Sequence, residues 1–278
     1  MNHGLYDLAA LDMDGTLLNS DHDTTPFTRQ ALRRADAAGK VIALCTGRCL
    51  SELWAHLDRI PGIRYAIGEN GGCLYDVRAK RVLYQAALDE AVAERLLDLA
   101  QARDVLVQCF FGGQSYIELT DLNRLGHYNM AYFESVFAAG SIFVGDVRAL
   151  RREKKQPLEK LNLYFASQAE KDLFWQSARD MDLHVSDSLG VGYEISPKDA
   201  SKARGLEALC RHLDLPVARA MAVGDGANDV ELMEAAGFSV AMGNAVADVL
   251  AAADAVVEDC DHDGAAKAVL RWLLGEDV

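Results

Sequence analysis

The sequence predicts an α/β protein in which a doubly wound parallel sheet forms the core and an α+β domain is inserted into it. Three observations support this prediction. Short apolar runs alternate with helical segments over the first seventy residues, and the same rhythm returns after residue 200. Between these parts, paired strand signals replace the alternation. The length of 278 residues also suggests more than one domain.

The first part of the chain is predicted to form two strand–helix units followed by a third strand. The first helix carries three signals: Thr25 can cap its amino end, Pro26 suits its first turn, and Gly39 follows its last residue. Strands joined by helices in this way run parallel to one another. The expected elements are strands at 6–11, 40–46 and 65–70 and helices at 26–38 and 50–58.

The last part of the chain repeats this rhythm. Its predicted strands are short and apolar on both faces, as expected for a sheet that helices cover on both sides. The expected elements are strands at 220–225, 238–242 and 255–257 and helices at 201–213, 229–236, 246–253 and 264–274.

The middle of the chain is predicted to form an inserted α+β domain at 83–190, which leaves 1–82 and 191–278 as the core. A run of basic residues at 148–155 is expected to be a solvated surface, with an anion gate over the site as the alternative. The expected elements are hairpins at 71–85 and 105–119, the second turning at Gly112-Gly113, helices at 88–104, 122–133 and 168–181, and strands at 159–166, 183–188 and 192–196.

Composition and charge exclude several classes of partner. The formal net charge of −14 weighs against nucleic acid or an anionic membrane, because both attract basic surfaces. Neither the six cysteines nor the seven histidines have the spacing of a zinc site or a disulfide framework. The chain lacks signal-peptide features, and no apolar run approaches the roughly 20 residues needed to cross a bilayer. We expect a cytoplasmic protein, monomeric or a small homo-oligomer.

Two carboxylates, Asp12 and Asp14, directly follow the first predicted strand, where ligands bind in open α/β sheets. Carboxylates this close repel each other unless a cation lies between them, and Mg²⁺ prefers oxygen ligands of this kind. The competing explanation is a solvated turn, since Asp and Gly are common in turns. The spacing alone leaves both explanations open.

Potential anion ligands follow the second predicted strand and open a later helix. The Thr46 hydroxyl and the Gly47 amide could cradle an anion. Lys202 lies in the first turn of a helix, where a cation is unfavourable for the helix dipole, so a bound phosphate would account for it. An ordinary turn capped by Thr46 and a solvated Lys202 are the simpler explanations.

The stretch at 222–229 ends an apolar strand with Asp225 and opens a helix with Asn228 and Asp229. Asp225 is well placed as a third carboxylate at the same sheet edge. Asp229 also favours a helix amino end for structural reasons alone. The later stretch VAMGNA, at 240–245, is predicted to be a turn rather than a site of direct chemistry.

In this order, the motifs resemble those of the haloacid dehalogenase superfamily of aspartate-nucleophile phosphatases, and more narrowly the Cof-type phosphatases. The resemblance implies a Rossmann-like core and places the insert where this family carries its cap, which would close over the site and exclude water. The matching stretches are LDMDGTLL (11–18), LCTGR (44–48), IGENGG (67–72), EISPKDASKARGLEAL (194–209) and AVGDGANDVELMEAAGFSVAMGNA (222–245).

The resemblance also implies roles for the carboxylates. Asp12 would attack phosphorus, while Asp14 would protonate the leaving oxygen and then deprotonate water. Mg²⁺ would be held by the Asp12 and Asp225 carboxylates and by the Asp14 carbonyl. Asp229 would support this metal site from outside the coordination sphere or through water.

Four further residues would hold or flank the phosphate under the same resemblance. They are Thr46, Gly47 through its amide, Lys202 and Asn228. Lys202 and Mg²⁺ would supply the positive charge that the transition state of phosphoryl transfer needs.

The implied function is Mg²⁺-dependent hydrolysis of a small phosphorylated metabolite through an aspartyl-phosphate, with sugar phosphates as the favoured substrates. One alternative is a mutase similar to phosphomannomutases, in which a sugar hydroxyl accepts the phosphate in place of water. A phosphatase for nucleotides or pyridoxal phosphate is another. A non-enzymatic, receiver-like regulatory protein is the third, and the full set of motifs weighs against it.

Overall fold

A computed structural model describes residues 6–188 and 190–278 of the chain, apart from the side chains of Ala55 and Ser188. The predictions that concern residues 1–5 and Leu189 lie outside the described residues. The chain divides into two compact units, and the second unit interrupts the first. The first comprises Met1–Arg48, Trp54–Tyr84 and Ser201–Val278, and the second comprises Cys49–Leu53 and Gln85–Ala200.

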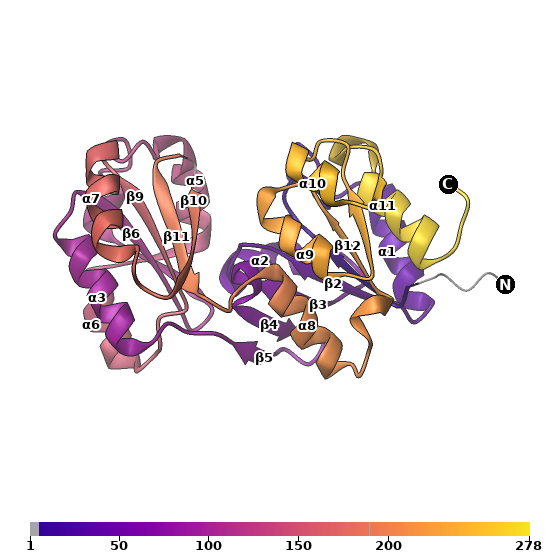
Figure 1. The fold of residues 1–278 in the computed structure, drawn as a ribbon, viewed down its shortest axis with the longest axis horizontal. Helices are drawn as coiled ribbons and strands as arrows, with labels where there is room; N and C mark the ends of the chain where they lie inside the picture. Colours follow the sequence, from indigo (N-terminus) through magenta and orange to yellow (C-terminus); the bar gives the residue numbers. More distant parts are fainter. Residues whose placement is uncertain (1–5, 189) are drawn as a thin grey trace. The chain divides into compact units, whose positions relative to one another are not determined.

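The first unit is built on a sheet that, among the described residues, has eight strands in the order β14–β13–β12–β1–β2–β3–β4–β5 (Figure 1). The chain extends the sheet from β1 toward β3 first and toward β14 later, so the sheet is doubly wound, as predicted. β14 to β3 are parallel, and β4 is antiparallel to β3. The strands are β1 Leu8–Leu11, β2 Val41–Cys45, β3 Ile63–Gly68, β4 Cys73–Asp76, β5 Arg81–Gln85, β12 Ala220–Gly224, β13 Phe238–Ala241 and β14 Ala255–Val256.

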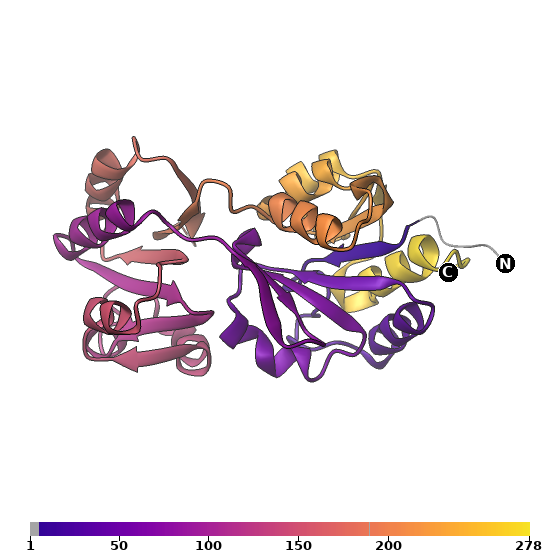
Figure 2. The same ribbon diagram turned by 90° about the horizontal axis from the view of Figure 1, so that it is seen from below.

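Helices cover this sheet on both sides. Leu8 and Ala10 of β1 share a buried cluster with residues of α8, α9 and α10, whereas Ala31 of α1 packs with Ala266 and Leu270 near the end of the chain. Figure 2 shows α11 beside α1. The helices are α1 Pro26–Ala37, α8 Lys202–His212, α9 Val230–Ala235, α10 Ala247–Ala252 and α11 Gly264–Ala268, which a π-helical turn, Val269–Leu273, continues. A further helix, α2 Leu50–Leu57, begins in the second unit and ends in the first.

The predicted boundary signals of the first helix are confirmed. The Thr25 hydroxyl accepts a hydrogen bond from the Thr28 backbone N–H at 3.0 Å. Pro26 is the first residue of α1, and Gly39, beyond the helix, has a φ of +78°. A left-handed residue after the last turn is the conformation that glycine adopts most readily.

The second unit is an α+β structure whose sheet, in the described part of the chain, has six strands in the order β10–β11–β9–β6–β7–β8. The hairpin predicted around Gly112-Gly113 is present, because β6 and β7 pair antiparallel on either side of these glycines. The strands are β6 Val105–Phe111, β7 Gln114–Glu118, β8 Ser141–Val144, β9 Lys160–Phe165, β10 Leu183–Ser188 and β11 Gly192–Pro197.

Each face of this second sheet has its own apolar cluster. Leu96, Phe174 and Val147 come from α3, α7 and α6 and pack on one face (Figure 1). Phe137 of α5 packs with Tyr128 on the other face. The helices are α3 Glu90–Gln101, α4 Leu119–Leu122, α5 Glu134–Gly140, α6 Val147–Lys154 and α7 Gln168–Ala178.

The helix predicted at 122–133 is wrong. α4 ends at Leu122, and the chain continues in turns until a 3₁₀ turn at Ala131–Phe133. Asn129 has a φ of +59°, a left-handed conformation that cannot continue a right-handed helix. Tyr128 and Met130 are both buried against the sheet, so tertiary packing overrides the local helical pattern.

The expectation that residues 148–155 form a solvated surface is wrong for Arg151. Its side chain is 3% exposed, and its guanidinium donates to the Glu90 carboxylate at 2.8 Å from both terminal nitrogens and also to Glu94. Arg148 donates to Glu94 at 2.6 Å and to Asp98 at 2.8 Å. Glu90, Glu94 and Asp98 recur every four residues, so they form an acidic stripe on α3 that fastens the unpredicted helix α6.

We predict that Glu94→Gln destabilises the protein by about 1–3 kcal/mol at neutral pH, because the buried guanidinium of Arg151 loses a charged partner. Hydrogen bonds from Arg148, Arg152 and Arg151 together lower the pKa of Glu94 from 4.5 to about 2. This contribution is therefore complete above pH 4.5 and is lost as the pH falls toward 2.

Urea unfolding of the wild type and the variant at several pH values measures this difference. Glu153→Gln, an exposed carboxylate on the helix of Arg151, is the control and should change the unfolding free energy by less than about 0.5 kcal/mol. A difference for Glu94→Gln that does not shrink in acid would contradict the prediction.

Candidate active site

Three predicted site residues follow neighbouring strands of the first sheet. β1 lies between β12 and β2 and is parallel to both. Asp225 follows β12, Asp12 follows β1 and Thr46 follows β2, so all three stand at the carboxyl edge of the sheet. This edge is where open α/β sheets bind ligands.

A buried ion triad joins Asp12, Lys202 and Asp229. Lys202 Nζ donates to Asp12 Oδ1 at 2.5 Å and to Asp229 Oδ1 at 2.6 Å. The Lys202 and Asp229 side chains are fully buried, and the Asp12 side chain is 9% exposed. The simpler explanation of a solvated Lys202 is thus excluded. An ammonium held here places positive charge directly beside the first carboxylate.

Close backbone contacts bring Lys202 to this position. The Ser201 hydroxyl caps α8, so Lys202 is the first residue of the helix. Gly71 has a φ of +97°, and a Cβ at that position would lie 1.8 Å from the Ser201 carbonyl oxygen. A Cβ at Gly205 would lie 2.3 Å from the Ile67 side chain. The two glycines therefore let the amino end of α8 pack directly on the end of β3.

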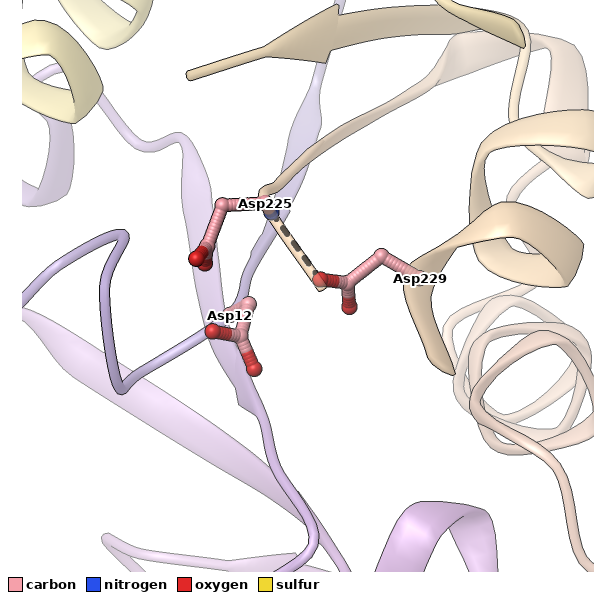
Figure 3. Close-up of side chains that lie close together, drawn as sticks. All are labelled: Asp12, Asp225 and Asp229. Atoms are coloured by element: carbon pink, nitrogen blue, oxygen red, sulfur yellow. Dashed lines mark hydrogen bonds between the residues drawn. The ribbon is translucent and has the colours of Figure 1, made fainter. Parts of the chain in front are cut away.

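Asp229 organises the loop after β12. Its Oδ2 accepts hydrogen bonds from the backbone N–H groups of Asp225 and Gly226, both at 3.0 Å, while its Oδ1 accepts from Lys202. Figure 3 shows Asp229 directed toward Asp225 and Asp12 with the first of these bonds drawn. Asp229 is fully buried, one of its oxygens is paired with the Lys202 ammonium and the other accepts two backbone N–H groups, so it suits a supporting position more than direct coordination of an ion.

The third carboxylate, Asp225, packs against the turn that follows β1. Its Oδ1 accepts a hydrogen bond from the Thr16 hydroxyl at 2.7 Å. Gly15 has a φ of +79°, and a Cβ at this position would lie 2.4 Å from Asp225 Oδ2. The turn thus needs glycine both for its conformation and for this approach. Sequence reasoning placed Asp225 at this edge but did not identify Thr16 as its partner.

Burial and mutual repulsion perturb the acidity of this cluster. Burial raises the pKa of Asp12 to about 7, and the neighbouring carboxylates of Asp229 and Asp225 add to the rise, while Lys202 opposes it. Burial alone would lower the pKa of Lys202, but Asp12 and Asp229 more than offset this and raise it. Burial also raises the pKa of Asp225. Such crowding of acids favours a bound cation.

Asp14 lies in a different environment from Asp12. Its carboxylate forms a bidentate pair with Arg48, with Nε–Oδ2 at 2.9 Å and Nη2–Oδ1 at 2.6 Å, and its side chain is 45% exposed. His56 contacts the same guanidinium at 3.1 Å. Burial, and then the positive charge of Arg48, lowers the pKa of His56. The two carboxylates, which only Met13 separates in sequence, therefore have separate partners.

The remaining predicted residues border this cluster. Thr46 is buried, and its hydroxyl accepts a hydrogen bond from the Arg48 backbone N–H at 3.2 Å. A Cβ at Gly47 would meet the Asn70 side chain at 3.2 Å. Asn228 is exposed and donates to Asn70 Oδ1 at 3.1 Å. Asn70 thus connects two predicted phosphate ligands, a role that sequence reasoning missed although the residue lies in the matching stretch 67–72.

The carboxylates meet the basic requirement of a Mg²⁺ site. Asp12, Asp225 and Asp229 each offer an oxygen, and these three oxygens lie within 4.8 Å of one another. Ligands on opposite sides of Mg²⁺, each at 2.0–2.1 Å, are about 4.2 Å apart, so small side-chain shifts suffice. The donor set is composed of oxygen atoms, which this hard cation prefers.

Comparison with known proteins identifies the family. Residues 9–269 match the model of a family described as haloacid dehalogenase-like hydrolase. Phosphatase YwpJ of Bacillus subtilis is 30% identical over 96% of this chain and 99% of its own length. An HMP-PP phosphatase of Cronobacter sakazakii is 29% identical over 96% of this chain and 95% of its own length. A solved structure of a haloacid dehalogenase-like hydrolase from B. subtilis superposes with a TM-score of 0.80 at 26% identity, covering 95% of this chain and 98% of that one.

The chain belongs to the haloacid dehalogenase-like hydrolases of the Cof type, so the predicted family, fold class and enzymatic nature are confirmed. The core motifs on which the family prediction rested lie at the carboxyl edge of the sheet described above. Among the residues that the structure describes, no helix is both long enough and apolar enough to span a bilayer.

We predict that Lys202→Met destabilises the metal-free protein by about 3–5 kcal/mol at neutral pH, because it leaves two buried carboxylates without their cation. Loss of the ammonium raises the pKa of Asp12 above its present value of about 7. A raised pKa contributes stability that is present at low pH and lost as the pH rises, so the deficit of the variant should shrink in acid.

Urea unfolding at pH values on both sides of 7 measures this deficit. Lys267→Met is the matched control, because Lys267 pairs with Glu258 at the surface, where an ion pair contributes about 0–1 kcal/mol. A deficit that is equal for the two variants, or one that grows in acid, would contradict the prediction.

Proposed function

We propose that this hydrolase removes phosphate from a small phosphorylated metabolite in the cytoplasm, with the help of Mg²⁺ and through an aspartyl-phosphate intermediate. The observation that carries the proposal is the buried triad of Asp12, Lys202 and Asp229 with Asp225 beside it. The Asp12 carboxylate can accept a phosphoryl group, and the negative charge of that group must be neutralised. The Lys202 ammonium and a cation bound by the neighbouring carboxylates would supply the positive charge.

Mg²⁺ would be held by the Asp12 and Asp225 carboxylates and by the backbone carbonyl of Asp14. When bound, it would neutralise charge on the phosphoryl oxygens. Asp229 would remain behind these ligands, because its oxygens already hold Lys202 and the loop after β12. The short spacing of the Asp12 and Asp225 carboxylate oxygens supports their part in this assignment.

Asp12 is proposed as the nucleophile. An oxygen of its carboxylate forms a bond to phosphorus while the bond from phosphorus to the ester oxygen breaks, and the leaving oxygen takes the electron pair. Lys202 favours the ionised form of the buried Asp12 carboxylate by opposing the rise in its pKa that burial causes. The same ammonium also lies beside the charge that develops on the phosphoryl group.

Asp14 is proposed as the general acid and then the general base. It would donate a proton to the leaving oxygen and later take one from the water that attacks the aspartyl-phosphate, which restores Asp12 and releases phosphate. The more exposed position of Asp14, with Arg48 and not Lys202 as its partner, supports this separate task. Two carboxylates in different environments can divide attack and proton transfer.

The phosphate would be held by the Thr46 hydroxyl, the Gly47 amide and Lys202, with Asn228 beside it. These groups surround the same strand ends as the acids. Residues 83–190 would act as a cap that selects the substrate. A sugar phosphate is the favoured substrate. A phosphatase screen over sugar phosphates, nucleotides and pyridoxal phosphate should test this preference.

We predict that Asp12→Asn lowers phosphate release from an aryl phosphate by about 10⁴–10⁶-fold, because the amide cannot attack phosphorus. Mg²⁺ should still bind, since Asp225 and the backbone ligand remain. A phosphate-release assay and a calorimetric Mg²⁺ titration measure the two properties. Asp261→Asn, which changes an exposed carboxylate bonded to Ser20, is the control. Near-normal turnover by Asp12→Asn would refute the proposed mechanism.

We predict that Asp14→Asn separates the two steps of the reaction. An aryl phosphate has a leaving group that departs without a proton, so the variant should still form the aspartyl-phosphate but hydrolyse it slowly. Rapid quenching should show a burst of aryl alcohol and an accumulated phosphoenzyme. With a sugar phosphate, release should fall by about 10²–10⁴-fold. Equal slowing with both substrates and no phosphoenzyme would assign another role to Asp14.

A product assay tests the mutase alternative. Wild-type enzyme with a sugar phosphate should yield free phosphate and the sugar. Formation of an isomeric sugar phosphate in place of free phosphate would favour the mutase.

A further inference from the structure

A single amide side chain, that of Asn244, joins three loops at the edge of the site. Asn244 lies between β13 and α10 and is exposed. Its Nδ2 donates to the Gly15 carbonyl oxygen at 2.8 Å and to Asp225 Oδ2 at 3.3 Å. Its Oδ1 accepts a hydrogen bond from the Cys260 backbone N–H at 3.0 Å. The stretch that contains it was predicted to be only a turn.

These contacts complete the support of the Asp225 carboxylate. Thr16 donates to one of its oxygens and Asn244 to the other. Gly15 packs against the second oxygen so closely that a Cβ there would overlap it. The backbone is fixed as well, since the Val246 N–H donates to the Asp225 carbonyl at 2.9 Å. The carboxylate is therefore held in one orientation from two sides.

The bond from Asn244 to the Gly15 carbonyl has a second consequence. Gly15 belongs to the turn that also carries Asp12 and Asp14. One amide nitrogen therefore contacts both the turn after β1 and the carboxylate after β12, and it keeps these two loops at a fixed separation. Ligands on different loops bind a cation more tightly when hydrogen bonds to their outer side hold them in place beforehand.

We propose that Asn244 is a positioning residue that sets the affinity of the site for Mg²⁺, by holding the Asp225 carboxylate against the turn that carries Asp12. The inference rests on the proposed function, because it takes Asp225 as a metal ligand. Asn244 does not coordinate the ion, since its carbonyl oxygen faces the Cys260 N–H and its nitrogen is a donor. Its effect on the ion passes through Asp225.

A purely structural role for Asn244 would have different consequences. If Asn244 only fastened its loop, its loss would lower the melting temperature of the metal-free protein and leave Mg²⁺ affinity unchanged. A positioning residue moves the Mg²⁺ affinity and the Mg²⁺ concentration that gives half-maximal turnover. Because Asn244 is exposed, water can replace its hydrogen bonds, and the fold should tolerate the substitution.

The test compares Asn244→Ala and Asn244→Ser with the control Asn19→Ala in the full chain. Asn19 is also an asparagine of a loop in the first unit, and its Oδ1 accepts from the backbone N–H groups of Asp21 and Asp23 at 3.1 and 3.0 Å. Mg²⁺ alone is titrated into metal-free protein by calorimetry, and the metal-free melting temperature is recorded. Turnover of an aryl phosphate is then measured at rising Mg²⁺.

We expect Asn244→Ala to bind Mg²⁺ about 10–100-fold more weakly, as for other residues that orient metal ligands, and to recover much of its turnover at saturating Mg²⁺. Asn19→Ala should match the wild type in both properties. Unchanged Mg²⁺ affinity in Asn244→Ala, or an equal loss in Asn19→Ala, overturns the inference. If the alanine variant does not fold without metal, Asn244→Ser decides by the same criteria. A wild type that neither binds Mg²⁺ nor releases phosphate overturns the proposed function and this inference together.

Discussion

The ammonium of Lys202, buried between two carboxylates, is the interaction on which the rest of the site depends. Burying one charge costs several kcal/mol, so Asp12, Asp229 and Lys202 are tolerated in this interior only as a set. The need to keep these three charges together also constrains the backbone around them. Gly71 and Gly205 allow α8 to reach the end of β3, and Asp229 ties the loop after β12 to the ammonium. The placement of α8 and of the loop after β12 is thus tied to the same buried charges as the site.

The same constraint explains how two adjacent acids differ. Asp12 directly follows β1 and stays in the interior with Lys202, whereas Asp14 lies further along the turn, is half exposed and pairs with Arg48. The two carboxylates differ in their surroundings because the backbone places them differently and because each has a different cationic partner. All of these residues belong to the first unit. Asn244 lies on the outer side of this turn, where its amide donates to the Gly15 carbonyl oxygen.

Much of the fold followed from sequence, because the strands of the first unit are apolar on both faces and its helices have clear end signals, as at Thr25 and Gly39. The strand-end motifs placed Asp12, Thr46 and Asp225 at one edge. Partners of those residues could not be predicted in this way. Contacts such as Thr16 with Asp225 or Asn228 with Asn70 join segments more than 150 residues apart, and no local pattern encodes them. The failed helix at 122–133 had local support, but burial of Tyr128 and the conformation of Asn129 decided against it.

The triad also has a consequence for biosynthesis. Asp12 and Lys202 are 190 positions apart, and Asp229 comes later still. On the ribosome, β1 emerges early with an acid that has no cation to meet, and the entire second unit is made before Lys202 appears. A nascent chain that has not reached Lys202 therefore holds the Asp12 carboxylate without the ammonium that it pairs with in the folded protein. The buried triad therefore cannot form until residue 229 has been synthesised, after the whole second unit.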